Sequence, residues 1–496
     1  MRKDIGKVPC ITLAIVALLL AACSKKSEGG GGAQAPAKAG ATSPVAGPEK
    51  AAQPPAGTDK QPGEGTPGKT EPAETPTPPT PPAPKITLVE FPPVENPAAA
   101  GPAYLVVNRV GLVQLDEGKF TRIQAPEENI KLVVVAPDGT VWAVGYRGLY
   151  KLQGDRLGKI SGRSASADQL AVGPQGDVWL ADFEGLAHFD GTAWMKEEKS
   201  VLGPGVALIE GLAVDSSGKP WAISSNAIHW READGWKTAD LSALGSDQKF
   251  FEEVAAGPGG EIYAAEMNGL VERSKDGKWA TVSLGEDTLG WGSASEVAVN
   301  AGRVVLAFNL GELVGLLPDG KLVQRQWSDE PKGDFLRAMA LDGAGRIWIA
   351  SDAGLAVIGP GGATVRFAPG TIAEAPGRID ELAVAGGGPV LPVPGEVRTG
   401  TVTGKIRKAG QPLAGAKMEI CASPATMFQE TPCTDAPFRA TATTDDQGGF
   451  KFENVPIFSY GFSVEVGGEW STSFLEDCCE GMQPGQAFDA GTYDLD

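Results

Sequence analysis

The 496-residue sequence contains only two histidines, His188 and His229, and only six cysteines. Two histidines argue against a multi-histidine metal centre and against most histidine-based acid–base catalysis. Positive charge is also scarce: 43 Lys and Arg stand against 62 Asp and Glu, a net charge of −19. That balance argues against nucleic acid as a partner, because phosphate binding needs a basic surface.

Recognisable catalytic motifs are missing as well. No Ser-His-Asp arrangement, phosphate-binding loop or Cys-x-x-Cys pair stands out in the sequence. We therefore expect no enzymatic activity, no cofactor and no metal site.

No hydrophobic run is long enough to span a membrane. Residues 8–20 form a largely apolar run of 13 residues after three basic residues, whereas a spanning helix needs about 20. This is the pattern of a signal-peptide core. The sequence Leu20-Ala21-Ala22-Cys23 that follows resembles the bacterial lipobox. The resemblance implies that residues 1–22 are removed and that Cys23 is acylated; an ordinary secretory signal is the alternative.

The lipobox resemblance also implies a location. The protein is expected to be exported and to touch the membrane through its lipid anchor only. Ser24 resembles the default for outer-membrane sorting in enteric bacteria, so the outer membrane is the expected site. Whether the protein faces the periplasm or the cell surface stays open.

Residues 23–85 read as a tether. Between residues 24 and 85 there are 14 prolines, no aromatic residue and no Leu or Ile. Such a stretch cannot bury a core, so it is expected to be disordered. A Pro-rich recognition motif is the alternative role.

A repeat of 37 to 43 residues begins after residue 100. One glycine recurs in a turn, and three residues after it stands a large apolar residue in most units. The glycines are Gly139, Gly176, Gly218, Gly260, Gly302, Gly345 and Gly388; the following residues are Trp142, Trp179, Trp221, Tyr263, Val305, Trp348 and Leu391. Each unit reads as four short strands with Asp-Gly turns, which is typical of a β-propeller.

Ring closure is also predicted. The first unit lacks its first strand, and residues 379–384 can supply it from the far end, which leaves no open sheet edge. We predict an all-β protein with a seven-bladed β-propeller at 86–395. Six or eight blades remain alternatives, mainly because residues 86–91 could form a further strand.

One unit, at residues 341–355, reads LDGAGRIWIASDAGL. It resembles the propeller repeat of two-component regulators, in which such propellers form the periplasmic sensor of hybrid histidine kinases. The resemblance implies the fold. A sensor role working through a separate kinase follows from it only as an alternative.

Residues 396–496 form the second predicted domain. The segments GTVTGKI at 400–406, GQPLAGAKM at 410–418 and TTDDQGGFKF at 443–452 resemble the carboxypeptidase-regulatory-like domain. That resemblance implies a small Ig/transthyretin-like β-sandwich related to CnaB domains.

Four cysteines, Cys421, Cys433, Cys478 and Cys479, lie in this predicted sandwich. An even number in an exported domain indicates two disulfides. A Cys478–Cys479 bond would close a strained ring, so we expect each of the two to pair with one of Cys421 and Cys433. A zinc site is the functional alternative.

In a propeller, the turns between strands 2 and 3 share a face with the loops between blades, and ligands usually bind there. The candidate ligand face comprises Arg109, Tyr146, Arg147, Phe183, Glu184, Asn226, Asn268, Asn309, Asp352 and Trp291, with Phe250, Phe251 and Phe335 in neighbouring inter-blade loops. The recurrent Trp and both histidines are expected to be structural instead.

These features favour a monomeric, lipid-anchored binding or scaffold protein of the cell envelope that recognises a protein or glycan partner. A propeller lyase or hydrolase acting on a polysaccharide or lactone is one alternative, and the sensor subunit is the other.

Overall fold

The computed structural model describes residues 90–160, 167–244, 250–266, 269–282, 284, 294–300, 302–308, 311–327, 334–425, 430–471, 479 and 482–495. The predicted signal peptide, Cys23 and the tether therefore lie outside the described residues. Pro79–Asp496 form one compact unit. Its described part contains strands and three short 3-10 turns, η2 (Lys199–Leu202), η3 (Ser242–Leu244) and η5 (Pro360–Gly362).

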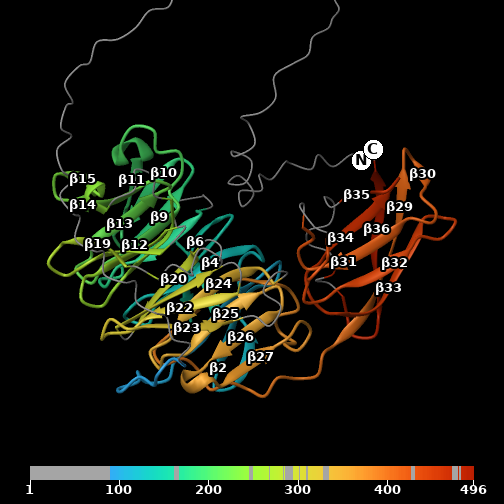
Figure 1. Cartoon of the computed structure of the whole chain (residues 1–496), viewed down its shortest axis with the longest axis horizontal. Helices are drawn as coiled ribbons and strands as arrows, with labels where there is room; N and C mark the ends of the chain where they lie inside the picture. The colour runs from blue at the N-terminus through green and yellow to red at the C-terminus, as the bar shows by residue number, and fades with distance from the viewer. Residues whose placement is uncertain are drawn as a thin grey trace, which may run out of the picture. The chain divides into compact units, whose positions relative to one another are not determined.

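Seven four-stranded antiparallel sheets fill the described chain between residues 103 and 384 (Figure 1). We number them as blades 1 to 7. Blade 1 has the strand order β28-β1-β2-β3, and blades 2 to 7 take four consecutive strands each, from β4–β7 to β24–β27. The first strands of successive blades, β28, β4, β8, β12, β16, β20 and β24, are neighbours around a closed ring. The predicted all-β propeller fold is confirmed.

The bounds of the propeller strands follow in chain order. They are β1 (Ala103–Val107), β2 (Gly111–Asp116), β3 (Lys119–Arg122), β4 (Ile130–Val135), β5 (Val141–Gly145), β6 (Gly148–Gln153), β7 (Arg156–Lys159), β8 (Gln169–Val172), β9 (Val178–Asp182), β10 (Gly185–Phe189), β11 (Trp194–Glu198), β12 (Gly211–Val214), β13 (Pro220–Ser224), β14 (Ala227–Glu232), β15 (Gly235–Thr238), β16 (Phe251–Ala256), β17 (Ile262–Glu266), β18 (Gly269–Arg273), β19 (Trp279–Val282), β20 (Ala294–Asn300), β21 (Arg303–Phe308), β22 (Glu312–Leu316), β23 (Leu322–Gln326), β24 (Leu336–Leu341), β25 (Ile347–Ser351), β26 (Gly354–Ile358), β27 (Thr364–Phe367) and β28 (Ile379–Val384).

The predicted closure by the C-terminal strand is also present. In blade 1, β28 pairs antiparallel with β1, so that Leu382 lies opposite Leu105. The two ends of the propeller chain are thereby hydrogen-bonded into one sheet, in which β1 lies between β28 and β2.

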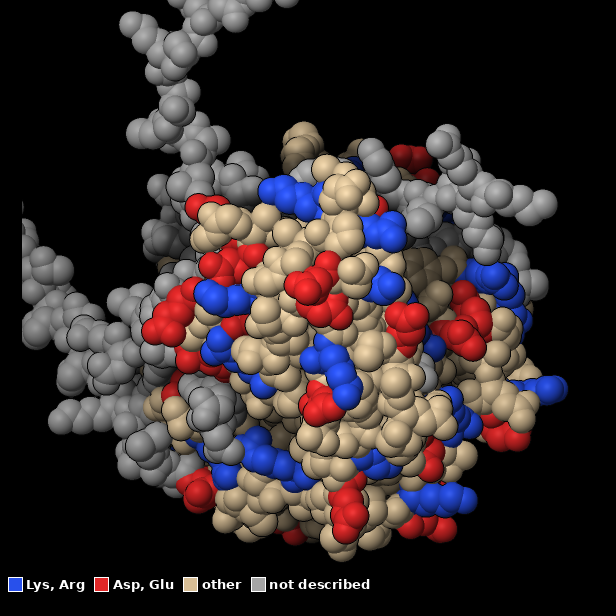
Figure 2. Space-filling model, turned by 90° about the vertical axis from the view of Figure 1, so that its right-hand side faces the viewer, with Lys and Arg blue, Asp and Glu red and all other residues tan. Residues whose placement is uncertain are grey.

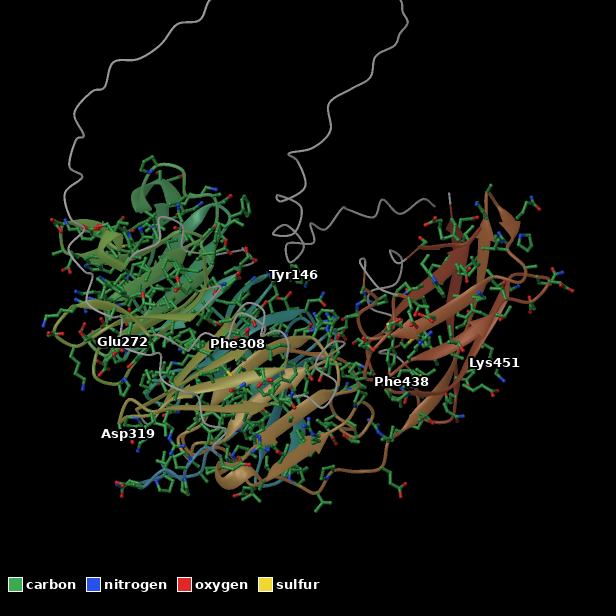
Figure 3. All side chains as sticks on the ribbon, viewed as in Figure 1. Tyr146, Glu272, Phe308, Asp319, Phe438 and Lys451 are labelled. Carbon is green, nitrogen blue, oxygen red and sulfur yellow. A yellow bond between two sulfur atoms is a disulfide. The ribbon has the colours of Figure 1, made fainter. Side chains whose placement is uncertain are left out.

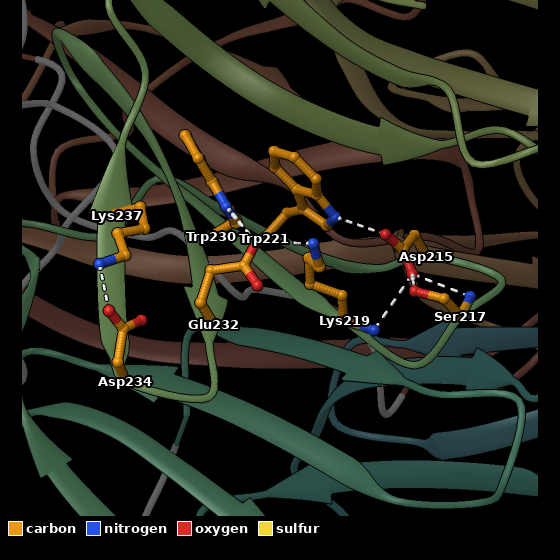
Figure 4. A network of polar contacts seen from close by, with 8 residues as sticks. All are labelled: Asp215, Ser217, Lys219, Trp221, Trp230, Glu232, Asp234 and Lys237. Atoms are coloured by element: carbon orange, nitrogen blue, oxygen red, sulfur yellow. Dashed lines mark hydrogen bonds and ion pairs between the residues drawn. The ribbon is translucent and has the colours of Figure 1, made fainter. Parts of the chain in front are cut away.

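The recurrent aromatic residue packs between neighbouring sheets, as expected. Ring centroids of Trp221 in blade 4 and Trp279 in blade 5 lie 6.3 Å apart. The indole N–H of Trp221 donates to Asp215 Oδ2 at 3.0 Å, and Asp215 Oδ1 accepts from the backbone N–H groups of Ser217 and Lys219 (Figure 4). The carboxylate thus ties the turn before the strand to the buried ring.

Glu90 and Phe91 are not in a strand, and the rest of the possible strand at 86–91 lies outside the described residues. Phe91 is buried and packs in the same apolar cluster as Val305 of blade 6. A Cβ on Gly315 would lie 2.2 Å from the Phe91 ring. Phe91 therefore fills space at the one described blade whose second strand carries Val in place of the aromatic residue.

The C-terminal region forms two further four-stranded sheets (orange to red in Figure 1). One contains β30 (Gln411–Pro412), β29 (Thr399–Lys408), β33 (Gly449–Pro456) and β36 (Ala487–Leu495); the other contains β32 (Ala440–Thr443), β31 (Lys417–Cys421), β34 (Gly461–Val466) and β35 (Glu469–Ser471). Their shared core includes the aromatic rings of Phe450, Phe452, Tyr460 and Phe462. The predicted β-sandwich is thereby confirmed.

The predicted disulfide pairing is wrong. Cys421 bonds to Cys433, with 5.8 Å between their Cα atoms, so neither pairs with Cys478 or Cys479. Cys421 ends β31, and Cys433 follows it only 12 positions later in the sequence. Closing so short a loop is entropically easier than joining segments more than 40 residues apart. Cys479 is also in a disulfide, whereas Cys478 lies outside the described residues.

Candidate functional site

Four aromatic side chains stand out from the propeller surface on one face. Tyr146 and Phe183 occupy strand 2–3 turns and are 51% and 64% exposed; Phe250 and Phe335 precede β16 and β24 and are 47% and 44% exposed. We call these four residues the aromatic rim; Tyr146 is labelled in Figure 3. No other Phe, Tyr or Trp among the described residues is comparably exposed. Aromatic side chains are enriched at binding interfaces relative to the rest of a protein surface.

The polar members of the predicted face differ in their backbone conformation and in their side-chain contacts. Arg109 is exposed and adopts a left-handed backbone with φ of 53°, which is costly for a residue with a side chain. Arg147 and Asn226 are exposed. Glu184 forms an ion pair with Lys196 of the outer strand β11.

Asp352 lies in the fold rather than on the surface. It is only 2% exposed, and its Oδ1 accepts two bonds from the Arg337 guanidinium, at 3.0 and 2.8 Å. It is therefore not available to a ligand in this arrangement. Asn268, Asn309 and Trp291 lie outside the described residues.

The inner strands add charged groups that motif reasoning overlooked. Glu253, Glu296 and Glu381 lie on β16, β20 and β28, the first strands of blades 5, 6 and 1. In each strand the pairing with the next strand skips one residue just before the glutamate: Glu252, Ser295 and Asp380. Such β-bulges re-aim side chains and are common beside functional sites.

The carboxyl groups of Glu253, Glu296 and Glu381, which we call the channel carboxyls, interact electrostatically with one another. Glu253 and Glu296 share a hydrogen bond, and the charge of Glu381 acts on Glu296 while that of Glu253 acts on Glu381. Burial raises the pKa of Glu253 to about 7 and that of Glu381 to about 8. Burial, together with the neighbouring Glu253, raises the pKa of Glu296 well above its usual value. At neutral pH the group therefore holds protons and can both donate and accept hydrogen bonds.

Cations on the same inner strands are already neutralised. Lys131 of β4 lies 2.9 Å from Asp168 Oδ1 and 5.6 Å from the centre of the Tyr146 ring. Arg337 of β24 is held by Asp352. Within the described part of the chain, no Lys or Arg forms an ion pair with the three channel carboxyls, and their protonation takes the place of a counter-charge.

A sequence signal for these glutamates exists. Glu253 and Glu296 are 43 residues apart, and Glu381 follows two repeats later, 85 residues on. Each stands before the alternating apolar residues of a first strand, at one register of the repeat. Comparing the repeats position by position, rather than by their turns alone, would have found them.

Both histidines have structural partners. His229 is buried, with Nε2 3.2 Å from Ser224 Oγ and Nδ1 3.0 Å from Thr238 Oγ1. Burial lowers its pKa to about 4, so it is neutral at pH 7. His188 stacks on Trp179 with 4.3 Å between centroids and lies 3.5 Å from Asp177.

No group of three or more His, Cys, Asp or Glu side chains is arranged to hold a metal ion within the described part of the chain. The described residues also contain no helix long and apolar enough to cross a membrane. On the face drawn in Figure 2, basic and acidic side chains are interspersed.

No protein-family description matches the sequence, and no curated protein matches it. Among solved structures, the chain is similar to the extracellular domain of the hybrid two component system BT3049 from B. thetaiotaomicron, at 11% identity and a TM-score of 0.44, over 82% of this chain and 56% of that one.

Two further structures are similar. One is the extracellular domain of the one component system BT4673 from B. thetaiotaomicron, with 15% identity, a TM-score of 0.39, and 51% of this chain covered. This chain spans only about a third of that chain's length, 35%. The other is virginiamycin B lyase from Staphylococcus aureus with quinupristin, with 12% identity, a TM-score of 0.43, and 54% and 94% of the two chains covered. At such identities the likeness concerns the fold alone.

Proposed function

We propose that this protein is an exported, lipid-anchored binding protein of the bacterial cell envelope whose propeller holds a glycan at the aromatic rim. The observation that carries the proposal is the rim itself: four exposed aromatic rings on one face of a rigid, closed ring of sheets. Preformed rings present apolar area at little conformational cost.

A glycan suits this face better than a protein partner does. The four rings come from blades 2, 3, 5 and 7, so they do not form one continuous apolar patch of the kind that a protein interface core requires. Between them lie polar turns, and the inner strands carry the partly protonated channel carboxyls. Sugars offer the matching alternation of apolar C–H faces and hydroxyl groups.

A binding screen tests the proposal. The purified full chain, in detergent micelles, is applied to arrays of bacterial and plant oligosaccharides, and any hit is titrated by calorimetry. The double substitution Y146A/F183A is expected to weaken binding at least tenfold, since each aromatic contact contributes about 1 kcal/mol or more. Met195→Ala is the matched control, because Met195 is 50% exposed on the outer strand β11. Equal binding by wild type and Y146A/F183A would contradict the rim as the site.

Acid–base catalysis on the same ligand is the second candidate. Its support is the hydrogen-bonded Glu253–Glu296 pair, because carboxyl groups with raised pKa values can act as general acids. The carboxyl groups of glycosidases are about 5–9.5 Å apart, farther than a hydrogen-bonded pair, which is why binding is the preferred function. Release of reducing ends by the wild type but not by E253Q or E296Q would establish the enzyme instead.

The anchor and the sensor role need separate tests. If Cys23 is acylated, Cys23→Ser should abolish labelling by a radioactive fatty acid and release the protein from membranes. If the protein is a sensor subunit, the rim ligand should change the phosphorylation of a partner kinase; binding alone supports the envelope binding protein.

A further inference from the structure

A cavity of about 530 Å³ lies between blades 5 and 6. We call it the inter-blade cavity. It is built wholly from propeller residues, on β17, β18, β19, β20, β21, β22 and the turns beside them. A cavity of this size is within the range of small-molecule sites.

The cavity exists because side chains at this blade junction are small. At the preceding junction, Trp221 of blade 4 meets Trp279 of blade 5, and the Arg273 guanidinium lies 5.2 Å from the Trp221 ring centre. The strand registers place Tyr263, Leu322 and Leu316 at the same three positions one blade later. Tyr and two leucines cannot occupy the volume of two tryptophans and an arginine.

Polar groups gather on the blade 5 side of the cavity. Tyr263 donates its hydroxyl to the carboxyl group of Glu272. Glu261 lies 3.2 Å from Lys275 Nζ and accepts the backbone N–H of Gly259 at 2.9 Å. Glu272, labelled in Figure 3, stands where blade 4 has Trp230.

Charge does not balance within this polar wall. The lining holds two carboxyl groups and one ammonium, and that ammonium, on Lys275, pairs with Glu261 while its side chain is 68% exposed. Burial and the charge of Glu261 both raise the pKa of Glu272. The blade 6 side offers Val299, Val304 and Leu316 instead. The cavity therefore pairs an excess of negative charge with an apolar wall.

We propose that the inter-blade cavity binds a small organic cation, an ammonium group carried on an apolar aryl or alkyl body. The ammonium lies between Glu261 and Glu272, where it donates hydrogen bonds to both carboxylates. The apolar body lies against Val304 and Leu316. This site is separate from the aromatic rim and does not depend on the proposed function.

Three probes of one shape and different charge test the proposal on the full chain: benzylammonium, benzyl alcohol and benzoate. Ligand-detected NMR measures the affinities at pH 7.5. Benzylammonium is expected to bind with a Kd on the order of 1 mM, the range for so small a ligand. Benzyl alcohol should bind about tenfold more weakly, and benzoate should not bind.

Two variants locate the site. Glu272→Gln should weaken benzylammonium about tenfold and leave benzyl alcohol unchanged, while Glu312→Gln, on β22 and outside the cavity lining, should change neither. Leu322 lies outside the lining but pairs with the lining residue Leu316, and Leu322→Trp introduces the side chain found at the preceding junction. This variant should abolish binding of both probes and leave the melting temperature equal or higher. Since a larger side chain can also destabilise a core, a melting temperature at or above that of the wild type is what shows that loss of binding does not come from unfolding.

The proposal is overturned if no probe binds at 10 mM, about ten times the expected Kd. It is also overturned if Glu272→Gln and wild type bind benzylammonium equally, or if the Leu322→Trp variant retains binding.

Discussion

Two junctions of the same propeller differ in the size of the side chains packed between their blades. One joins blade 4 to blade 5, and the other joins blade 5 to blade 6. The first is filled by Trp221 and Trp279, with Trp230 stacked 5.5 Å from Trp221. The second has Tyr263 and leucines and encloses the inter-blade cavity. The repeat therefore sets the backbone, and the size of individual side chains decides whether a junction is fully packed or contains a cavity.

The carboxylate that accepts the indole N–H of the recurrent Trp also stands at different sequence positions in different blades. In blades 4 and 7 it stands six residues before the tryptophan: Asp215 for Trp221 and Asp342 for Trp348, at 3.0 and 2.9 Å from the indole nitrogen. In blade 3 it stands two residues before, where Asp177 lies 3.2 Å from Trp179 Nε1.

Blades 3 and 5 both carry glycine at the six-before position. A Cβ on Gly173 or Gly257 would lie 2.2 Å from Asp177 or 2.7 Å from Glu261. A carboxylate two residues before the aromatic residue thus requires glycine six residues before it. In blade 5, Tyr263 has no indole N–H that could donate to Glu261. The Glu261 carboxylate instead lines the cavity.

Replacing the large aromatic ring by alanine should give the largest difference in stability loss between the two junctions. Trp221→Ala is expected to destabilise the protein by about 3–5 kcal/mol, because it opens a large void in a filled wall. Tyr263→Ala should cost about half as much, since that ring already borders open space. Denaturant midpoints followed by circular dichroism measure both; equal losses would mean that the two junctions are equally packed.

Removing the turn carboxylate should come next. Asp215→Ala leaves the Trp221 indole N–H and the backbone N–H groups of Ser217 and Lys219 without their acceptor. Unsatisfied buried donors cost about 1–3 kcal/mol each, and water can reach part of this turn, so the expected loss is about 2–3 kcal/mol. Asp319→Ala, at an exposed turn of blade 6, is the control and should change stability by less than about 1 kcal/mol.

The channel should respond to pH, unlike the aromatic walls. Glu381 has a folded-state pKa of about 8, above the 4.3 expected when unfolded, roughly. The folded state therefore binds more protons than the unfolded state, and the stability from this group is complete below about pH 4.3 and is lost as pH rises towards 8.

Glu381→Gln should remove that loss. Gln keeps an oxygen to accept the Leu382 backbone N–H, which Glu381 Oε1 accepts at 2.9 Å. At pH 9 the variant should be more stable than wild type by on the order of 2 kcal/mol, and at about pH 4 the difference should be near zero. Thermal melts across this range measure it, with the exposed Glu198→Gln as control. A difference that does not vary with pH would show that Glu381 does not titrate in this way.

The smallest expected effect is a gain. Blade 2 has Ala136 and Thr140 at the two carboxylate positions, and Trp142 Nε1 is buried without a hydrogen-bond partner among the described residues. Ala136→Asp should supply the missing acceptor and stabilise the protein by about 1 kcal/mol. The same substitution in a Trp142→Phe background should give no gain; a gain there would show that the aspartate acts on the turn alone.

Several structural features were predictable because they repeat locally. The recurrent glycine, the residue three positions later and the Asp-Gly turns predicted four-stranded units, and the strand at 379–384 predicted ring closure. Strands, turns and the aromatic side chains between neighbouring sheets depend on residues within about 40 positions of one another. Their pattern can therefore be recognised in the sequence. The sandwich was recognised from its motifs in the same way.

What only the tertiary structure decided involves residues that no local pattern connects. Cys421 bonded to Cys433 because β31 and its returning loop bring them together, whereas counting cysteines left three pairings open. Asp352 was expected on the surface and is buried because Arg337 from the first strand of the same blade reaches it.

Glu253, Glu296 and Glu381 stand in three different blades, and closure of the ring turns their shared register into one group of coupled carboxyls. The sequence by itself determined the repeating unit, because short-range spacing sets strands and turns. The cavity between blades 5 and 6 and the state of the channel carboxyls were decided by the ring, because burial and charge coupling depend on neighbours that only folding supplies.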